Sequence, residues 1–293
     1  MDLLKNEKVL PVPPAALLAL ARAALAEDVG RGDVTSLVTV PPEARARARF
    51  VAREGLVVSG LGAALAVFHE ASAGEARFSA LVEEGERVEA GATLAAVEGG
   101  ARDVLAAERV ALNLVMRLSG VATLTSRYVE AVRGTGARIT DTRKTTPGLR
   151  LLEKTAVRAG GGTNHRSGLD DGILIKDNHL ALAGGVAEAV RRAREGAPHL
   201  LKVEVEVESL GELGEALGAG ADVVLLDNMT PDEVRTCVEF VRKESPGTVV
   251  EVSGGVNLST VRALAEAGAD LISVGALTHS AHSADVSLEV ESC

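Results

Sequence analysis

Aromatic side chains are almost missing from this chain of 293 residues, which has no tryptophan, one tyrosine and four phenylalanines. Proteins that bind single-stranded nucleic acids stack bases on such rings. Basic residues are also outnumbered by acidic ones, 31 to 41, which gives a formal net charge of −10. Broad nucleic-acid binding needs an excess of Lys and Arg over phosphates. The composition therefore argues against a nucleic-acid partner, and a planar substrate must be held by groups other than paired aromatic rings.

Cysteines and long apolar runs are also scarce. Cys237 and Cys293 lie far apart and outside any metal-binding spacing, so we expect two free thiols in a cytoplasmic protein. No stretch approaches the roughly 18 apolar residues that span a bilayer. Arg22 interrupts the apolar N-terminal run, which favours an amphipathic helix over 15–27 rather than a signal peptide. The sequence thus predicts no membrane partner.

The first hundred residues and the rest of the chain differ in pattern. After the helix over 15–27, glycine-containing turns separate short runs of strand-forming residues at 48–52, 56–59, 77–82 and 93–97. This alternation predicts a small β-rich domain with one or two helices. A long helical region follows over 103–133, and Ser119-Gly120 predicts a break in it.

From about residue 137 onward, strands and helices alternate. We expect strands over 138–142, 172–175, 202–207, 223–226, 249–252 and 271–274, and helices over 181–195, 210–217, 231–243 and 258–267. The last four strands start 21 to 26 residues apart, which is the length of one strand–helix unit. A parallel sheet closed into a barrel fits this order best, and an open doubly wound sheet is the alternative.

Polar or glycine-containing clusters follow nearly every expected strand of this region. They are Asp141 to Lys144, Lys176 to His179, Glu206 to Glu208, Asp227-Asn228, Ser253 to Gly255 and Gly275-Ala276. One such cluster alone would be an ordinary solvated loop. Because the catalytic groups of α/β barrels lie at the carboxyl ends of the strands, six in succession predict a site there.

The segment from residue 202 to 208 alternates charged residues with valines. Val203, Val205 and Val207 share one face of the predicted strand, and Lys202, Glu204, Glu206 and Glu208 share the other. In a barrel the valines would pack against helices and the charges would point inward. Inward carboxylates need cations, a metal or a polyhydroxyl ligand. An antiparallel strand with one wet face would give the same pattern.

Positive charge is concentrated between residues 138 and 179. Eight basic and five acidic residues give this segment a net charge of +3, which leaves −13 for the rest of the chain. Such a segment suits a small ligand with several negative charges, because Arg donates two parallel hydrogen bonds to carboxylates or phosphates. Arg150, Lys154 and Arg158 are spaced four apart, as on the surface of a helix.

Three further features bear on ligands. Ser253-Gly254-Gly255 and Val274-Gly275-Ala276 end the last two strands, whose loops often hold a phosphate in barrels. Arg109 interrupts an apolar helical stripe, so it either reaches the edge of its helix or crosses an interface to an anion. His279 and His282 form an isolated pair that indicates a surface position rather than a metal site.

Three segments resemble the quinolinate phosphoribosyltransferase family, also called carboxylating nicotinate-nucleotide pyrophosphorylases. They are Asp141 to Arg150, Gly160 to Arg166 and Leu174 to His179. The resemblance covers roughly residues 20–285, with further matches at Glu27 to Thr35, Glu108-Arg109, Val203 to Glu208, Leu226 to Asn228 and Ser253 to Gly255. Thr155 and Ala159 replace residues that are more often Tyr and Cys in the family.

The resemblance implies a particular fold and reaction. An N-terminal α/β open-sandwich domain is expected over 1–115, an incomplete seven-stranded α/β barrel over 116–275, and a C-terminal tail over 276–293 that packs on the N-terminal domain. The implied reaction transfers a phosphoribosyl group from phosphoribosyl pyrophosphate to quinolinate with decarboxylation, and it requires Mg2+. The enzyme would be a cytoplasmic homodimer, or a hexamer, in which Arg109 reaches the partner's site.

The resemblance also assigns roles to individual residues. Lys144, Lys176, Glu206 and Asp227 are the expected catalytic residues, and Glu206 and Asp227 are also expected to hold Mg2+, directly or through water. The expected substrate-binding residues are Arg109, Thr142, Arg143, Lys144, His165, Arg166, Lys176, Glu206, Asp227, Ser253, Gly254, Gly255, Val274, Gly275 and Ala276. The cations would hold quinolinate and neighbouring phosphates, and the glycine-containing loops would hold the 5′-phosphate.

Three other functions stay open from the sequence. A paralogue of the same family, associated with molybdate transport, would act on another substrate. A barrel lyase would form a Schiff base on Lys176, which ends a strand. A metabolite sensor would use the same pocket without catalysis.

Overall fold

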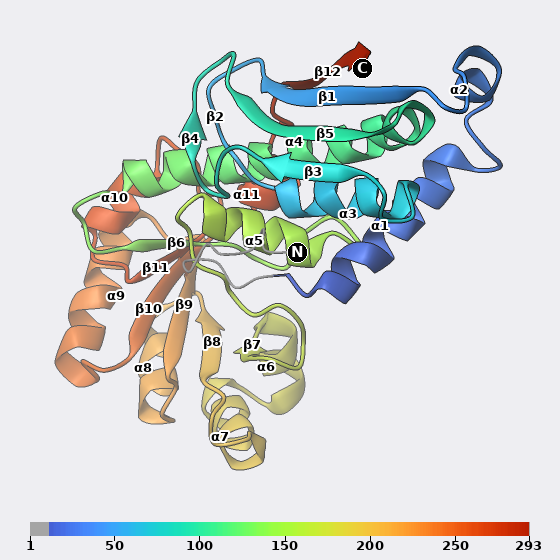
Figure 1. Cartoon of the computed structure of the whole chain (residues 1–293). Helices are drawn as coiled ribbons and strands as arrows, with labels where there is room; N and C mark the ends of the chain where they lie inside the picture. Colours follow the sequence, from blue (N-terminus) through green and yellow to red (C-terminus); the bar gives the residue numbers. More distant parts are fainter. Residues whose placement is uncertain (1–11, 293) are drawn as a thin grey trace. The chain divides into compact units, whose positions relative to one another are not determined.

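The computed structural model describes residues 12–292, which form two compact units (Figure 1). The first unit combines the described residues up to 126 with 145–161 and 280–292. The second combines 127–144 with 162–279. Within the described part of the chain, no helix combines the length and apolar character needed to cross a membrane.

An antiparallel sheet of four strands, in the order β12-β1-β5-β3, organises the first unit. Its strands are β1 (Arg45–Ala52), β3 (Arg77–Ala80), β5 (Thr93–Gly100) and β12 (Val286–Ser292), and a separate short pair joins β2 (Leu56–Val57) to β4 (Arg87–Val88). Phe50, Phe68 and Phe78 pack edge-on or tilted, with ring centroids 6.0–6.1 Å apart. Most of the chain's aromatic residues therefore lie in this core.

Five helices contribute to the first unit. They are α1 (Pro14–Val29), α2 (Val34–Thr39), α3 (Leu61–Ala71), α4 (Ala101–Ala131), whose last residues belong to the second unit, and α5 (Arg150–Ala159). The carboxylate of Glu84 accepts hydrogen bonds from the backbone N–H groups of Gly60 and Leu61, at 3.0 and 2.7 Å, at the start of α3. Burial raises the pKa of Glu84 above its ordinary value. This carboxylate replaces the local capping side chain that α3 lacks.

The long helix α4 runs without interruption, so the break predicted at Ser119-Gly120 is wrong. A Cβ atom on Gly120 would lie 1.9 Å from the carbonyl oxygen of His282, so the backbone approaches here too closely for any side chain. The Ser119 hydroxyl accepts from the Ser59 N–H and donates to the Ser59 carbonyl, each at 3.0 Å. These residues serve packing, and tertiary contacts override their weak helix propensity.

A parallel sheet of six strands, in the order β6-β11-β10-β9-β8-β7, organises the second unit. The strands are β6 (Arg138–Thr140), β7 (Ile173–Ile175), β8 (Val203–Val207), β9 (Val223–Asp227), β10 (Val249–Ser253) and β11 (Leu271–Ser273). Each lies within a range predicted from the sequence or differs from it by one residue at an end. A single-residue parallel bridge joins Thr163 to Thr140 beside β6. The resemblance implies seven strands, and the sheet has six, with this bridge as an additional parallel pairing.

The helices of the second unit are α6 (Asp177–Ala183), α7 (Val186–Gly196), α8 (Leu210–Gly218), α9 (Pro231–Glu244), α10 (Val261–Glu266) and α11 (Ala276–His279). The single helix predicted over 181–195 is wrong, because two helices occupy this region. Gly184 and Gly185 separate them with φ angles of 96° and 115°, a backbone conformation that ends a right-handed helix. The helix predicted over 258–267 is shorter than expected and begins at Val261.

Candidate active site

The charged face of β8 lies inside the second unit, as expected if this strand belongs to a parallel sheet covered by helices. Val203, Val205 and Val207 are at most 1% exposed. On the opposite face, Glu204 contacts His165 and Glu206 contacts Lys176. Lys202 and Glu208, at the two ends of the alternating run, are exposed. The face of β8 that carries Glu204 and Glu206 therefore packs against charged side chains rather than against apolar ones.

Lys176 and Glu206 form an ion pair at the carboxyl ends of the neighbouring strands β7 and β8. Glu206 is largely buried, with a side chain that is 11% exposed, whereas the Lys176 side chain is 44% exposed. Lys176 also precedes the first residue of α6. Two predicted catalytic residues, Lys176 and Glu206, thus lie together at the carboxyl-terminal edge of the parallel sheet.

The next two strand ends are joined through their backbones. Asp227 and Ser253 are paired in the register of β9 and β10, and the Asn228 N–H donates to the Ser253 carbonyl at 3.0 Å. Gly254 has a φ angle of 90°, and a Cβ atom there would lie 2.3 Å from Oδ1 of Asn228. Only glycine fits at this position, and the side-chain amide of Asn228 donates to the Asp227 carboxylate at 2.5 Å.

Lys144 lies beside the loop that follows β11. The hydroxyl of Thr142 accepts from the Lys144 N–H at 3.0 Å, and that of Thr278 donates to the Lys144 carbonyl at 2.8 Å. A Cβ atom on Gly275 would lie 3.3 Å from Cδ of Lys144, so the lysine side chain covers this glycine. Val274 is buried, and Ala276 begins α11. The loops after β6 and β11 therefore lie in contact with each other.

Two guanidinium groups lie close enough to affect each other. Burial and the charge of Arg143 lower the pKa of Arg166, while Glu204 and Asp171 act in the opposite direction. Nη1 of Arg166 donates to the Gly172 carbonyl at 3.0 Å. Like charges held together in a half-buried place favour an anionic ligand, which would relieve their repulsion.

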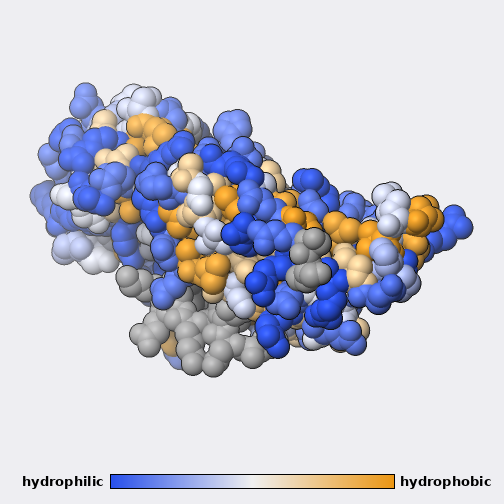
Figure 2. Space-filling view, turned by 45° about the horizontal axis from the view of Figure 1, so that its top comes forward, coloured by the Kyte–Doolittle hydropathy of each residue, from blue (hydrophilic) through white to orange (hydrophobic). Residues whose placement is uncertain are grey.

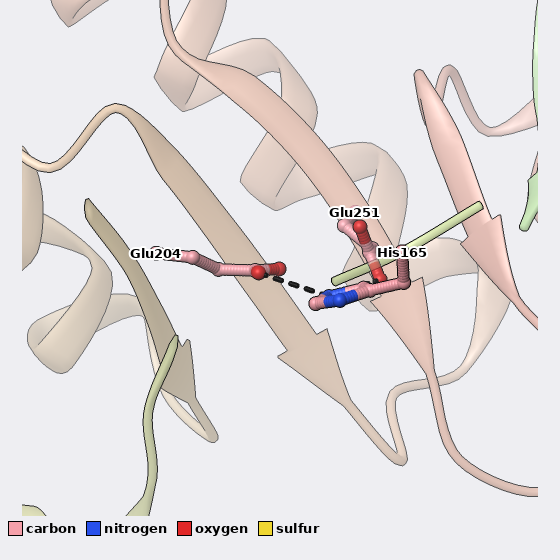
Figure 3. Close-up of side chains that lie close together, drawn as sticks. All are labelled: His165, Glu204 and Glu251. Carbon is pink, nitrogen blue, oxygen red and sulfur yellow. Dashed lines mark ion pairs between the residues drawn. The ribbon is translucent and has the colours of Figure 1, made fainter. Parts of the chain in front are cut away.

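A group of buried polar side chains lies deeper in the sheet (Figure 3). Nε2 of His165 is 3.0 Å from Oε2 of Glu204 and 3.7 Å from Oε1 of Glu251. Burial, followed by the charge of Glu204, raises the pKa of Glu251 to about 7. Ser273 donates to Glu251 through its hydroxyl group. These groups come from the loop after the Thr163 bridge and from β8, β10 and β11.

Sequence reasoning missed Glu251 and Ser273 as members of the site. A partial signal for Glu251 was present, because Val250 to Ser253 alternates apolar and polar residues as β8 does. Asp141, which was expected only as part of a strand end, is fully buried. Its carboxylate accepts from the His165 N–H at 2.9 Å and from the Asn164 amide at 2.5 Å.

A cavity of about 370 Å3 adjoins this group within the second unit. Its lining includes His165, Arg166, Glu204 and Glu251, together with Arg138, Thr140, Thr163, Asn164, Asp171, Gly172, Ile173, Leu200, Leu201, Lys202, Val223 and Leu271. Several of these residues start their strands, so the cavity reaches toward the amino ends of the sheet.

Arg109 is the only predicted site residue that lies in the first unit, where it is exposed on α4. All the others lie in the second unit. His279 and His282 are exposed, and the group of possible metal ligands among the described residues is His165, Glu204 and Glu251, whose ligand atoms lie within 4.8 Å of one another.

Comparison with known proteins connects this arrangement with one family. The model of the quinolinate phosphoribosyl transferase N-terminal domain matches residues 33–119, and that of the C-terminal domain matches residues 121–289. The chain is 44% identical over 271 residues to the nicotinate-nucleotide pyrophosphorylase [carboxylating] of Mycobacterium leprae, an alignment that covers 92% of this chain and 95% of the relative. It is 42% identical over 266 residues to a probable enzyme of the same name from Synechocystis, with 91% and 90% covered.

Solved structures agree with the sequence comparison. The crystal structure of NadC from Streptococcus pyogenes superimposes with a TM-score of 0.91 at 38% identity, covering 97% of this chain and 99% of that one. The nicotinate-nucleotide pyrophosphorylase of Francisella tularensis gives a TM-score of 0.88 at 36% identity, covering 96% and 98%. The similarity therefore extends through both units and their connections.

Proposed function

The chain belongs to the quinolinate phosphoribosyl transferase family, and we propose that it transfers a phosphoribosyl group from phosphoribosyl pyrophosphate to quinolinate with decarboxylation. The products are nicotinate mononucleotide, CO2 and pyrophosphate, in the biosynthesis of NAD. The observation that carries the proposal is the match of both family domains to a chain whose strand ends bring cations and carboxylates together.

The cationic residues suit the two carboxylates of quinolinate. Arg143 and Arg166 are held near each other, and Lys176 lies at the neighbouring strand end. Arginine binds carboxylates in a two-point geometry, whereas lysine contributes a compact charge. Lys144 completes the proposed cationic set, and His165 directly precedes Arg166 in the chain. Such a pocket orients the pyridine ring through its carboxylates and needs no aromatic partner.

The carboxylates suit the ribose and a metal ion. Glu206 and Asp227 lie at the carboxyl ends of the adjacent strands β8 and β9 and offer oxygen atoms, the ligands that Mg2+ prefers. Glu206 already contacts a cation, Lys176, which supports its proposed contact with the positive charge of a metal or a reacting sugar. Mg2+ would supply charge neutralisation for the departing pyrophosphate. Gly254, Gly255 and Gly275 would hold the 5′-phosphate through backbone N–H groups.

The proposed reaction has two stages. The bond between C1′ of the ribose and the pyrophosphate oxygen breaks, and Glu206 and Asp227 stabilise the positive charge that develops at C1′. The pyridine nitrogen then bonds to C1′. The bond from C2 to its carboxylate breaks, CO2 leaves, the positively charged ring nitrogen stabilises the electron pair at C2, and C2 takes up a proton. The protein acts by positioning and electrostatics.

Assembly as a homodimer in the cytoplasm is part of the proposal. Helix α2 exposes three apolar side chains, Val34, Leu37 and Val38, which are 71%, 54% and 77% exposed. Figure 2 shows apolar residues gathered over the part of the first unit where Figure 1 places α2. Exposed apolar surface of this kind is typical of subunit interfaces. Arg109, exposed on α4, would enter the partner's site.

Complementation tests this shared site. Arg109→Ala and Lys144→Ala should each lose most activity as pure proteins. If Arg109 acts in the partner's site, mixing the two after reversible dissociation should restore activity at roughly a quarter of the sites, because half of the dimers are mixed and each contains one intact site. Mixed proteins that stay inactive would contradict a shared site.

A substrate panel tests the reaction itself. The purified protein should form nicotinate mononucleotide from quinolinate, phosphoribosyl pyrophosphate and Mg2+, and should form none from nicotinate. Turnover of a different acceptor would favour the paralogue. Covalent trapping of Lys176 by borohydride with a carbonyl substrate would favour the lyase, and ligand binding without release of pyrophosphate would favour the sensor.

A further inference from the structure

The buried group of His165, Glu204 and Glu251 has a geometry that the proposed reaction does not account for. Both carboxylates face Nε2 of the same imidazole, at 3.0 and 3.7 Å (Figure 3). Glu204 is 7% exposed and Glu251 is 2% exposed. One carboxylate would be enough to pair with one imidazole, and a second buried charge is costly. The second carboxylate therefore calls for a functional explanation.

The other nitrogen of His165 identifies which atom carries the ring proton. The backbone N–H of Arg166 donates to Nδ1 of His165 at 2.7 Å, so Nδ1 uses its lone pair as an acceptor. A neutral imidazole with an accepting Nδ1 carries its proton on Nε2. That proton points at Glu204 and Glu251. A metal ion would need the lone pair of Nε2, so this arrangement fits a hydrogen-bonded ring better than a metal ligand.

The same contact links the carboxylates to Arg166. His165 connects Glu204 and Glu251, through its ring, to the backbone N–H of the next residue. Asp141 fixes the segment from the other side by accepting the His165 N–H at 2.9 Å. The Arg166 guanidinium is held by the Gly172 carbonyl at 3.0 Å. The position of Arg166 therefore depends on how the imidazole ring is held.

The cavity connects these groups in space. His165, Arg166, Glu204 and Glu251 all line it. Oε1 of Glu204 is buried and has no hydrogen-bond partner among the residues that the structure describes. Glu204 also acts electrostatically on Arg166 and opposes the repulsion from Arg143. Glu204 and Glu251 therefore lie close enough to affect the position of Arg166, although neither stands at the end of its strand.

We propose that Glu204 and Glu251 are positioning residues for the pyridine dicarboxylate: they hold the His165 ring by its Nε2–H group and thereby set the position of Arg166. The proposal rests on the proposed function for the identity of the ligand. It predicts that the two carboxylates affect the quinolinate half of the site and leave the phosphoribosyl pyrophosphate half, built on Glu206, Asp227 and the glycine loops, largely unaffected.

Matched substitutions test the positioning role. Glu204→Gln and Glu251→Gln keep the side-chain size and remove the charge, and Glu251→Asp keeps the charge. Glu188→Gln is the control, because Glu188 lies on α7 and pairs only with Arg191 and Arg192 among the contacts described. Quinolinate binding by calorimetry and steady-state kinetics with each substrate varied are measured for all four, after circular dichroism confirms folding.

The proposal predicts a selective change. Loss of supporting hydrogen bonds behind a ligand-binding residue typically weakens binding or activity about ten- to hundredfold. Both Gln variants should raise the Kd and KM for quinolinate by such a factor, with the KM for phosphoribosyl pyrophosphate within about twofold of the parent. Glu251→Asp should recover part of the loss. Unchanged quinolinate binding in the Gln variants, or an equal rise for both substrates, would overturn the proposal.

A spectroscopic measurement on the unmodified protein decides the geometry independently of activity. The 15N chemical shifts of His165, assigned by comparison with His165→Gln, should show protonated Nε2 and unprotonated Nδ1 near neutral pH. A proton on Nδ1, or a shift of Nε2 on addition of Mg2+ or Zn2+, would overturn the proposal. A protein that gives the expected tautomer but no nicotinate mononucleotide would contradict the proposed function alone.

Discussion

Strands β1 and β8 carry the same alternation of charged and apolar residues in opposite surroundings. In β1, Arg45, Arg47 and Arg49 are exposed and the intervening residues are buried. In β8, the valines are buried against the outside of the sheet and the charged residues Glu204 and Glu206 lie in its interior. The period of two is identical, and its local chemistry gives no indication of which face meets water.

The neighbouring strands decide the outcome. β1 lies between two antiparallel strands, and its arginines form ion pairs across the sheet, Arg47 with Glu98 at 3.1 Å and Arg49 with Glu291 at 2.7 Å. β8 lies in a parallel sheet whose outer face is covered by helices, so its charged face has only the interior left. A charged face turned inward is costly in folding, and its partners are the groups that we assign to catalysis.

The largest effect on stability is expected at a buried charge outside the parallel sheet. Glu153, on α5, is fully buried and accepts hydrogen bonds from Arg117, at 2.7 and 3.0 Å, and from Thr146. Removing one partner of a buried ion pair costs about 3–5 kcal/mol because the other charge is left unpaired. Glu153→Ala should therefore lower the free energy of unfolding, measured in urea, by that amount. A loss below about 1 kcal/mol would show that burial does not distinguish the stability contribution of Glu153 from that of the exposed ion pairs of β1.

The next largest effect concerns activity. Lys176→Ala removes the cation paired with Glu206, and we expect kcat/KM to fall about 10²- to 10³-fold with little change in the melting temperature. Lys243→Ala is the matched control, because Lys243 is exposed on α9 and contacts Glu244. Activity retained by the Lys176 variant, measured as nicotinate mononucleotide formed, would contradict a catalytic role for the inward face.

A pH effect separates Glu251 from the surface charges. The pKa of Glu251 is raised from its ordinary value of 4.5 to about 7, so its contribution to stability is full below pH 4.5 and is lost as the pH rises through 7. The loss should be on the order of 3 kcal/mol. Melting temperatures between pH 5 and pH 8 should fall more for the parent protein than for Glu251→Gln. Parallel pH profiles of the two proteins would refute a raised pKa at Glu251.

The smallest effect is expected at β1. Arg49→Ala removes the ion pair between Arg49, whose side chain is 45% exposed, and Glu291, whose side chain is 54% exposed. Such exposed pairs contribute about 0–1 kcal/mol to stability. The unfolding free energy should change by less than about 1 kcal/mol. This difference should shrink further at about 1 M salt, where the Debye length falls to roughly 3 Å. A loss comparable to that of Glu153→Ala would remove the distinction on which the comparison rests.

The strands of the parallel sheet could be predicted because each is marked by a pattern in its own local sequence. Apolar runs follow the repeated turns Ala219 to Asp222 and Ala267 to Asp270, and each of the six strands begins within one residue of its expected start. The features that were wrong depend on contacts with distant parts of the chain. Gly120 continues a helix because the backbone at His282 passes against it, which no local pattern reveals.

The site divides in the same way. The strand-end residues could be predicted because parallel strands bring their carboxyl ends to one edge, and the motifs resemble those of a known family. Glu251 could not be assigned, because a glutamate between valines has no role until β10 places it beside His165. The tautomer of His165 depends on the backbone N–H of Arg166, which the sequence does not position.

Release of CO2 tests the central claim most directly, since the cations at the carboxyl ends of the parallel strands are proposed to bind a dicarboxylate that loses one carboxylate. Quinolinate labelled with 14C in its 2-carboxylate is incubated with the protein, Mg2+ and phosphoribosyl pyrophosphate, and labelled CO2 and pyrophosphate are measured together. We expect one CO2 for each pyrophosphate, and none when phosphoribosyl pyrophosphate is omitted. Pyrophosphate released without labelled CO2, or no release of either, would contradict the account.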